Sequence, residues 1–252
     1  MASTEDFPAG GFAYVPGVFQ YSGGVRALPG FRIERIRFAR PLPLAAGFAR
    51  IAAILRDQNR PLTAFCGCEL RSPAPFTEDG FQSFNRGYAK TLTEWGVMVG
   101  DHNPVARSNV CPEIGPPAEP SFHAFCFTRP DPGAMASFMV SGSGEVPEGR
   151  ANYRDHIVRA GDTSAEGMCA KADFVMAEMT RRLSALGADW SAVTATQVYT
   201  VHAIHSFLPD MLMRHGTAAA HGITWHFARP PIVGLDFEMD CRAIAMERVV
   251  AG

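Results

Sequence analysis

Hydrophobic residues recur at helical spacing in three stretches of the chain. They lie three or four positions apart within 44–55, 77–95 and 164–186, which predicts three amphipathic helices. Thr77 stands at the N-cap position of the second helix, and Gly187 follows the third as a natural stop. A shorter helix is expected over 207–215, with a proline in its first turn.

Alternating or continuous apolar runs between these helices predict strands. The clearest is 31–38, where apolar residues alternate with charged ones apart from one slip. Residues 1–17 show little periodicity and are expected to form an arm. The other expected strands are 62–70, 103–111, 121–128, 138–146 with 155–160 as a hairpin, 193–201, 223–228 and 235–246.

The pattern occurs twice along the chain. An apolar strand ending in Ser-Gly occurs at Ser22-Gly23 and again at Ser141-Gly142, and each copy continues through strands and helices in the same order. The Pro- and Gly-rich stretch 129–133 is the clearest linker. We therefore predict two α+β units, 1–131 and 132–252, each a mixed sheet packed on helices.

Composition limits which partners and which cellular locations are expected for this protein. The 252 residues carry a net charge of -2 without a basic stripe, so no nucleic acid is expected as a partner. No apolar run approaches the ~20 residues of a membrane-spanning helix, and the acidic start lacks a signal-peptide pattern. Six scattered cysteines without a CxxC pair predict reduced thiols in a cytoplasmic protein, and no metal site is predicted.

Each half resembles a domain of the Rid family of enamine and imine deaminases. The likeness rests on the two Ser-Gly strands, on 106–110 with its arginine, on the Asn-x-x-Tyr spacing of Asn85 and Tyr88, and on the closing strand 237–245. Duplicated members of this kind are similar to 2-aminomuconate and 2-amino-5-chloromuconate deaminases. The resemblance implies two tandem Rid-like (chorismate-mutase-like) domains. It also implies trimers of domains with ligand clefts between neighbours, hence a homotrimer or a multiple of three chains.

The resemblance also implies a reaction without a metal or organic cofactor. An arginine holds a substrate carboxylate, since its planar fork matches two carboxylate oxygens. An acidic residue and backbone groups near the Ser-Gly strand place a water that attacks an imine carbon, and ammonia leaves. On this basis Arg107 is the expected anchor and Asp240 the expected acid and base. Glu238, on the same face of the strand, is the alternative.

Further residues are expected around the substrate. Asn85 and Tyr88 are candidates, although Tyr88 also fits a core position. The remaining candidates are Ser22, Gly23, Ser141, Gly142, His221 and His226. The two histidines flank the strand of the second half where the arginine is missing, near Gly222, and are candidates for a second substrate carboxylate. Satisfied histidines near the sheet are the alternative.

The halves lack different parts of the pattern. The acidic position of the first half falls at His123 or Phe125, which carry no carboxyl group. We therefore hypothesise a composite cleft that combines Arg107 of the first half with Asp240 of the second, while the reciprocal cleft is inactive or structural.

The expected function is hydrolytic deamination of a 2-aminomuconate-type enamine or imine acid. The alternatives are a general 2-aminoacrylate scavenger, a non-catalytic small-molecule-binding protein and a chorismate-hydrolysing enzyme. Without the resemblance, Arg107 reads as an ordinary salt-bridge residue and Asp240 as an exposed strand position.

Overall fold

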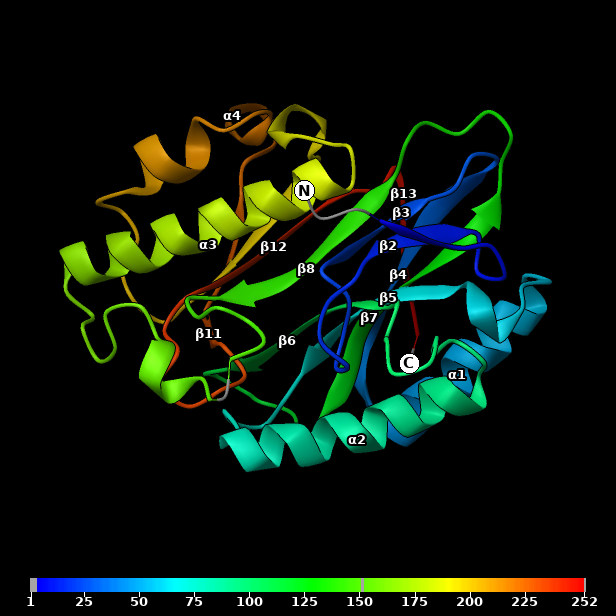
Figure 1. Cartoon of the computed structure of the whole chain (residues 1–252), viewed down its shortest axis with the longest axis horizontal. Coiled ribbons are helices and arrows are strands. Elements are labelled where there is room, and N and C mark those ends of the chain that lie inside the picture. Colours follow the sequence, from blue (N-terminus) through cyan, green and yellow to red (C-terminus); the bar gives the residue numbers. More distant parts are fainter. Residues whose placement is uncertain (1–3, 151, 252) are drawn as a thin grey trace.

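The computed structural model describes residues 4–150 and 152–251, which form two β-sheets stacked face to face between helices. In Figure 1, α3 covers one sheet and α1 and α2 cover the other. A third apolar cluster, which includes Phe12, Val25, Cys66 and Met139, fills part of the space between the sheets. The layers are therefore helix, sheet, sheet, helix, as expected when each sheet buries both faces.

One sheet has seven strands and the other has six. The strands of the seven-stranded sheet are, in spatial order, β1 (Glu5–Phe7), β2 (Phe12–Val15), β3 (Gly24–Ala27), β8 (Phe138–Gly144), β12 (Glu238–Ala243), β9 (Ala195–Tyr199) and β10 (Thr224–His226). Those of the six-stranded sheet are β11 (Ala228–Arg229), β6 (Ala106–Pro112), β5 (Phe65–Arg71), β7 (Ser121–Pro130), β4 (Phe31–Pro43) and β13 (Met246–Val250).

The two sheets contain the same four-strand unit. The order β6-β5-β7-β4 in one sheet matches β10-β9-β12-β8 in the other. The senses match too, because the first pair of each unit is parallel and the next two pairs are antiparallel. The matches of β5 with β9, β6 with β10 and β7 with β12 follow the order expected from the sequence repeat, whereas the counterpart of β8 is β4 and not the strand at Ser22-Gly23.

The prediction of two tandem Rid-like domains is nevertheless wrong. Strands cross between the halves, because β3 pairs with β8, β13 pairs in parallel with β4, and β11 pairs with β6. Each sheet is thus completed by strands from the other half of the sequence. The α+β class holds, but the sheets are not those of two separate domains in a row.

The helices lie close to their predicted positions. They are α1 (Leu44–Asp57), α2 (Glu78–Glu94), α3 (Ala165–Ala185), the short α4 (Ala218–His221), a π-helical turn at Leu208–Met213, and 3-10 turns at Leu62–Ala64, Arg154–His156 and Trp190–Ala192. Thr77 Oγ1 accepts the backbone N–H of Gly80 at 3.1 Å and so caps α2. Gly187, at φ 73°, ends α3 in the left-handed conformation that glycine adopts without strain.

Two strand predictions differ from the structure. The segment 155–160 pairs with no strand, and a 3-10 turn begins just before it. The expected arm contains β1 and β2 instead. All four residues of β2 are buried, so its sequence shows no alternation of apolar and polar positions. Residues 1–3 of the arm lie outside the described part of the chain.

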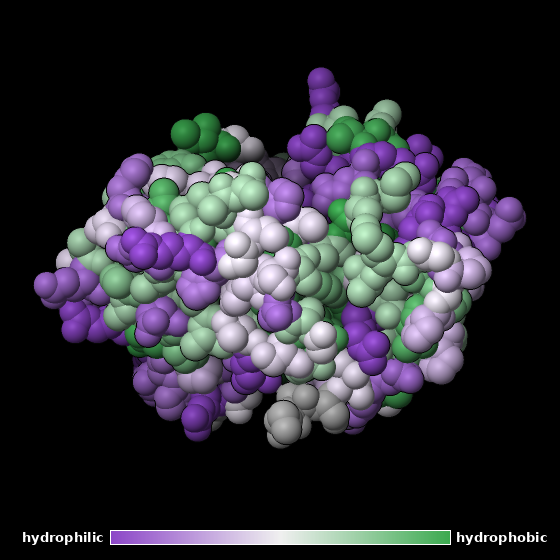
Figure 2. All heavy atoms as spheres, turned by 90° about the horizontal axis from the view of Figure 1, so that it is seen from above, coloured by the Kyte–Doolittle hydropathy of each residue, from purple (hydrophilic) through white to green (hydrophobic). Residues whose placement is uncertain are grey.

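Seen from above, the surface mixes hydrophilic and hydrophobic residues (Figure 2). Within the described ranges, no helix has both the length and the apolar character needed to cross a membrane.

Candidate active site

A pocket opens where β6 of one sheet faces β8 and β12 of the other. We call it the Arg107 pocket. Its lining comes from these strands, from α2 and from three loops: Tyr21, Phe81, Arg107, Asn109, Gly142, Ser143, Gly144, Val146, Glu148, Tyr153, Pro231, Ile232, Leu235 and Glu238. The pocket therefore takes residues from both halves of the chain.

Arg107 is buried with its guanidinium among aromatic rings. Its Cζ lies 4.9 Å from the ring centre of Tyr88, 5.2 Å from Tyr21 and 5.7 Å from both Phe81 and Phe84. The terminal nitrogens Nη1 and Nη2 are buried, and no acceptor for them exists among the described residues. Aromatic faces stabilise the cation but leave its in-plane donors free. A buried guanidinium in this state is suited to an incoming carboxylate.

Glu238 supplies the carboxyl group of the same pocket. Burial, reinforced by the negative charges of Asp240 and Glu145, raises its pKa well above the usual value, and the positive charge of Arg107 opposes this only in part. The raised pKa favours the protonated carboxyl group, which leaves the charge of Arg107 free for a ligand and supplies a proton donor in the same pocket.

Gly142 makes room for this carboxyl group. A Cβ atom at this position would lie 2.2 Å from Oε1 of Glu238 and 3.1 Å from Cβ of Ser108. The glycine of the second Ser-Gly strand is thus required by the close approach of the Glu238 side chain.

The two Ser-Gly strands meet each other and hold Arg107 in place. The backbone N–H of Ser22 donates to Val105 O at 2.9 Å, just before β6. The hydroxyl of Ser141 accepts the backbone N–H of Arg107 at 3.0 Å and donates to Ser22 O at 2.5 Å. Both serines are fully buried. Their place in the structure is the seam between the sheets, and they fix the strand that carries Arg107.

Arg182 on α3 supports the opposite wall of the pocket. Its Nη1 donates to the carbonyl oxygens of Ser141 and Gly142 at 3.0 and 3.3 Å, and its Nη2 lies 3.0 Å from Oε1 of Glu148.

Burial, with a smaller contribution from Glu148, raises the pKa of Tyr153 to about 12, so this phenol is a proton donor at neutral pH.

A buried ion cluster fixes the start of β12. Glu145 accepts the backbone N–H groups of Asp236 and Phe237 at 2.6 and 3.1 Å. Lys171 on α3 lies 3.2 Å from Glu145 and 2.9 Å from Asp236. These contacts hold the two residues before Glu238 and thereby set where its side chain enters the pocket.

The predicted residues Asn85 and Tyr88 lie on α2 behind Arg107. Asn85 is completely buried, and neither of its amide atoms has a partner within the described chain. The hydroxyl of Tyr88 lies 3.3 Å from Cys68 Sγ, and its ring stacks under the guanidinium of Arg107. Neither residue lines the pocket, and Tyr88 contacts the anchor through its ring. Gly23 lies in the seam beside Ser22 and pairs with Ser141 N–H at 3.2 Å.

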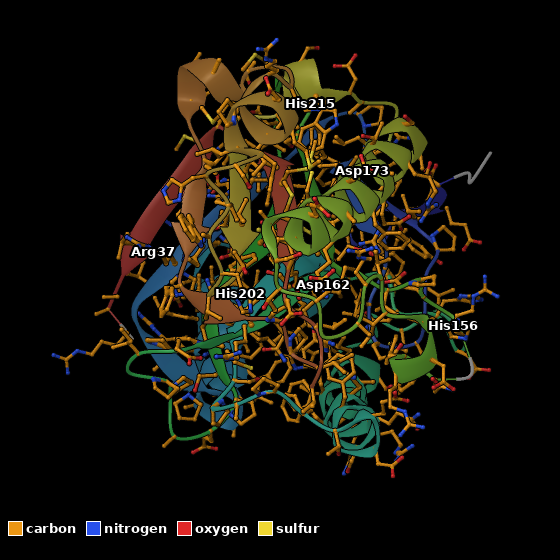
Figure 3. The ribbon with its side chains drawn as sticks, turned by 90° about the vertical axis from the view of Figure 1, so that its left-hand side faces the viewer. Arg37, His156, Asp162, Asp173, His202 and His215 are labelled. Carbon is orange, nitrogen blue, oxygen red and sulfur yellow. The ribbon has the colours of Figure 1, made fainter. Side chains whose placement is uncertain are left out.

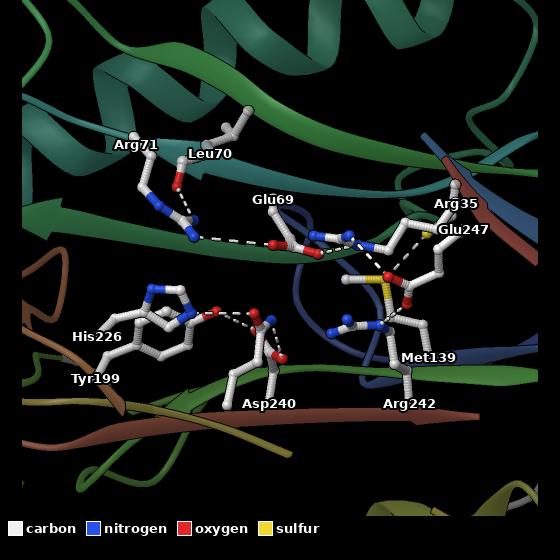
Figure 4. Close-up of polar contacts among 12 residues, drawn as sticks. Arg35, Glu69, Leu70, Arg71, Met139, Tyr199, His226, Asp240, Arg242 and Glu247 are labelled. Carbon is white, nitrogen blue, oxygen red and sulfur yellow. Dashed lines mark hydrogen bonds and ion pairs between the residues drawn. The ribbon is translucent and has the colours of Figure 1, made fainter. Parts of the chain in front are cut away.

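Asp240 lies apart from Arg107, in a second polar cluster between the sheets (Figure 4). It accepts hydrogen bonds from Gln197 Nε2 and Tyr199 Oη, both at 2.8 Å. His226 belongs to the same cluster, with Nε2 at 3.1 Å from Gln197 Oε1 and its ring stacked on Tyr199. His221 ends the short helix α4 and does not line the Arg107 pocket. The structure therefore brings Arg107 together with Glu238 and Gly142, and not with Asp240, His221 or His226.

Among the lining residues, sequence reasoning named Arg107, Gly142 and Glu238, and those it missed include Tyr21, Asn109, Glu148 and Tyr153. Tyr21 immediately precedes Ser22-Gly23, so its adjacency to the motif was a usable signal. Asn109 sits two positions after Arg107 on the same strand face, and its Nδ2 has no acceptor in the described chain. Glu148 and Tyr153 lie in a loop without periodicity, which left no signal. Across residues 4–150 and 152–251, no group of three or more His, Cys, Asp or Glu side chains is arranged to hold a metal ion.

Sequence comparison identifies the family. Residues 4–248 match the family described as 2-aminomuconate deaminase CnbZ, so the chain belongs to this family. It is 47% identical over 252 residues to a 2-amino-5-chloromuconate deaminase of Comamonas testosteroni, covering 99% of this chain and 100% of that protein. The expected deaminase activity, which acts on a C–N bond, is thereby confirmed. The assignment to the Rid family is not supported.

Structural comparison corrects the expected fold. A chorismatase crystal structure aligns with a TM-score of 0.50 at 14% identity, covering 91% of this chain and 79% of that one. This likeness concerns the fold alone, and it extends over the two-sheet arrangement rather than one Rid-like half. A cyanuric acid hydrolase from A. caulinodans aligns at a TM-score of 0.40 and 12% identity, over 86% of this chain and 67% of that one, which is too low to support an argument. The boundary at residue 131, trimeric assembly and a cytoplasmic location stay predictions.

Proposed function

We propose that this protein deaminates a 2-aminomuconate-type substrate by hydrolysis in the Arg107 pocket. The observation that carries the proposal is the buried guanidinium of Arg107, whose terminal nitrogens have no acceptor among the described residues, in one pocket with Glu238, whose pKa burial raises. The family match and the 47% identical chloromuconate deaminase support the substrate class. Such a substrate has a carboxylate directly beside the carbon that bears nitrogen, so one arginine can place the reacting carbon.

In the proposed binding mode, Arg107 holds the carboxylate adjacent to the amino-bearing carbon through its two free terminal nitrogens. Asn109, whose Nδ2 is free of acceptors within the described ranges, donates to the second carboxylate. The apolar wall of Phe81, Ile232 and Leu235 packs against the diene. Low polarity around the ligand strengthens the charged contacts.

Glu238 acts first as an acid in this proposal. Its proton is transferred to the enamine carbon next to the amino-bearing carbon, and the nitrogen lone pair forms the C=N bond of the imine. The carboxylate that remains then takes a proton from water as the water oxygen attacks the imine carbon. The result is a carbinolamine with nitrogen and oxygen on one carbon.

The second half of the reaction returns the proton. Glu238 donates it to the amino group, the C–N bond breaks and ammonia leaves. The carbinol O–H becomes the ketone as its proton passes to the Glu238 carboxylate, which restores the starting carboxyl group. The balance is one enamine and one water giving one 2-oxo acid and one ammonia. The raised pKa makes the Glu238 carboxylate a stronger base than an ordinary carboxylate, which suits the removal of these protons.

The test is ammonia release from 2-aminomuconate and from enzymatically generated 2-aminoacrylate, with the purified wild type and Arg107→Ala. The proposal expects rapid release from 2-aminomuconate that is lost in Arg107→Ala. Arg86→Ala, an exposed residue on α2, is the matched control and retains activity. Release from 2-aminoacrylate alone would identify a general imine scavenger, and release from neither would favour a binding protein. Either result would overturn the proposal.

A further inference from the structure

A second pocket lies between the sheets, away from Arg107. We call it the basic pocket. It is lined by Arg35, Arg37, His123, Gln197, Thr224, His226, Arg242, Glu247, Arg248 and Val249. It contains none of the residues that line the Arg107 pocket.

The basic pocket is the topological counterpart of the Arg107 pocket. In the repeated four-strand units, β10 corresponds to β6 and β7 corresponds to β12. The Arg107 pocket takes its arginine from β6 and its carboxyl group from β12. The corresponding strands of the basic pocket contribute Thr224 and His226 from β10 and His123 from β7. Arg107 and Glu238 therefore have no equivalent on these two strands, and the basic pocket is not a second deaminase site.

The basic pocket is lined mainly by positively charged side chains. Four of the lining residues are arginines, from β4, β12 and β13, whereas Glu247 is the one carboxylate in the lining. Glu247 is shared, since it lies 3.2 Å from Arg35 Nη1 and 2.6 Å from Arg242 Nε. Nη1 of Arg242 is buried without an acceptor in the described part of the molecule. The lining thus has more cationic donors than carboxylate acceptors.

Arg37 and Arg248 form the accessible rim. Both are exposed, and neither is ion-paired within the described residues. They belong to neighbouring parallel strands, in which Arg248 is registered with Ile36 and Val249 with Arg37. In the side view, Arg37 lies at the edge of the molecule next to β13 (Figure 3). Two guanidinium groups therefore flank the entrance.

Two histidines inside the pocket are kept neutral, mainly by burial. Burial, followed by the charge of Arg71, lowers the pKa of His123 to about 3 and that of His226 to about 4. The other charged groups around them are Glu69, which acts in the opposite direction, Arg35 and, for His226, Arg242. The imidazoles are therefore neutral, and each carries a single N–H donor. That of His226 is directed to Gln197 Oε1 at 3.1 Å, whereas that of His123 can donate to an anion.

We propose that the basic pocket binds a compact oxyanion with two negative charges, a dicarboxylate or inorganic phosphate, at a site separate from catalysis. Arg37 and Arg248 admit the anion, and Arg242 and His123 hold it further in. Charged hydrogen bonds from arginine and imidazole donors are the usual means of holding such groups. The site shares β12 with the Arg107 pocket, because Glu238 and Arg242 lie on the same face of that strand.

The test is calorimetric titration of the full chain with cis,cis-muconate, a dicarboxylate without the amino group. Two binding events per chain are expected. Arg107→Ala removes one, and the double variant Arg37→Glu/Arg248→Glu weakens the other about tenfold or more, as loss of charged hydrogen bonds predicts. The rim residues are exposed, so this variant folds and keeps releasing ammonia from 2-aminomuconate.

The control carries the same change of charge elsewhere. Arg40→Glu/Arg86→Glu replaces two exposed arginines that line neither pocket, and both binding events remain. In a second arm, inorganic phosphate competes with muconate for the rim-sensitive event if any compact oxyanion is accepted, and fails to compete if the site is selective for dicarboxylates. One binding event in the wild type, or equal weakening in the rim and control variants, would overturn the proposal whether or not the Arg107 pocket is catalytic.

Discussion

Gly142 and Glu238 face each other across adjacent strands so closely that a methyl group on Gly142 would lie 2.2 Å from the carboxyl oxygen Oε1. The two residues come from the second Ser-Gly strand and from the closing strand, β8 and β12, which pair antiparallel. The glycine of the motif is therefore explained by the side chain it admits, and the position of the carboxyl group depends on it.

Gly142→Ala is expected to displace Glu238 and lower kcat/KM for 2-aminomuconate about 10²-fold, the usual cost of moving a catalytic group by about an ångström. Gly87→Ala is the control, since Gly87 lies on α2 with nothing within 4 Å of an added Cβ. It should retain full activity and gain up to about 1 kcal/mol in stability from its better helix propensity. Unchanged kinetics in Gly142→Ala would mean that the carboxyl group at this position is not used.

The raised pKa of Glu238 makes a prediction about stability. The folded state holds this proton more tightly than the unfolded chain does, so the stabilisation is complete below the unfolded pKa of about 4.3 and is lost as pH rises through the folded pKa. Glu238→Gln cannot ionise and should match the wild type near pH 4. At pH 8 the variant should be more stable than the wild type. The difference is about 1.4 kcal/mol for each pH unit by which the folded pKa, or pH 8 if that is lower, exceeds the unfolded pKa. Urea unfolding at both pH values measures this, and a variant that is less stable at pH 8 would contradict burial as the cause.

Arg107→Lys keeps the charge and removes the planar fork. Losing one of two charge-assisted hydrogen bonds should reduce kcat/KM ten- to hundredfold, at about 1.5–3 kcal/mol per bond. Arg86→Lys, on the exposed side of α2, should change nothing. Steady-state kinetics with 2-aminomuconate distinguishes the two, and an unaltered kcat/KM in Arg107→Lys would show that a point charge suffices and that bidentate contact is absent.

Lys171→Met tests the cluster that holds the start of β12. The substitution leaves Glu145 and Asp236 without their cation in a buried site, which should cost about 3–5 kcal/mol of unfolding free energy. Burial already raises the pKa of Glu145, so protonation should reduce this loss at acidic pH. Calorimetric unfolding against Lys90→Met, an exposed lysine on α2, provides the comparison. A loss below about 1 kcal/mol would show that the cluster is not needed to hold this segment.

The parts of the fold that local pattern determines could be predicted. α2 and α3 have regular apolar stripes, capping hydroxyls at Thr77 and Ser164, and in α3 a terminal glycine, so their bounds were nearly right. The run 235–246 reads as one strand, whereas in the structure β12 ends at Ala243 and the following strand joins the other sheet. Which sheet a strand joins depends on long-range pairing, and no local periodicity encodes it. The tandem-domain prediction failed for the same reason.

The candidate site, like the fold, was predictable only where a local motif marks a residue. The residues that each half lacks predicted a cleft combining Arg107 with Asp240. The pocket does combine the two halves, but it contains Glu238 and not Asp240. The resemblance favoured Asp240, and the residues alone could not separate it from Glu238 because residues two apart on a strand share a face. Their different surroundings come from the way the two sheets stack, which places Glu238 beside Arg107 and Asp240 with Gln197 and Tyr199.

The most direct measurement is therefore kcat/KM for ammonia release from 2-aminomuconate by Glu238→Gln and Asp240→Asn, compared with the wild type under conditions where both variants are folded. The account predicts a loss of about 10²–10⁴-fold for Glu238→Gln, the usual contribution of a general acid and base, and less than about tenfold for Asp240→Asn. Full activity in Glu238→Gln together with an inactive Asp240→Asn would contradict the assignment of the Arg107 pocket as the active site.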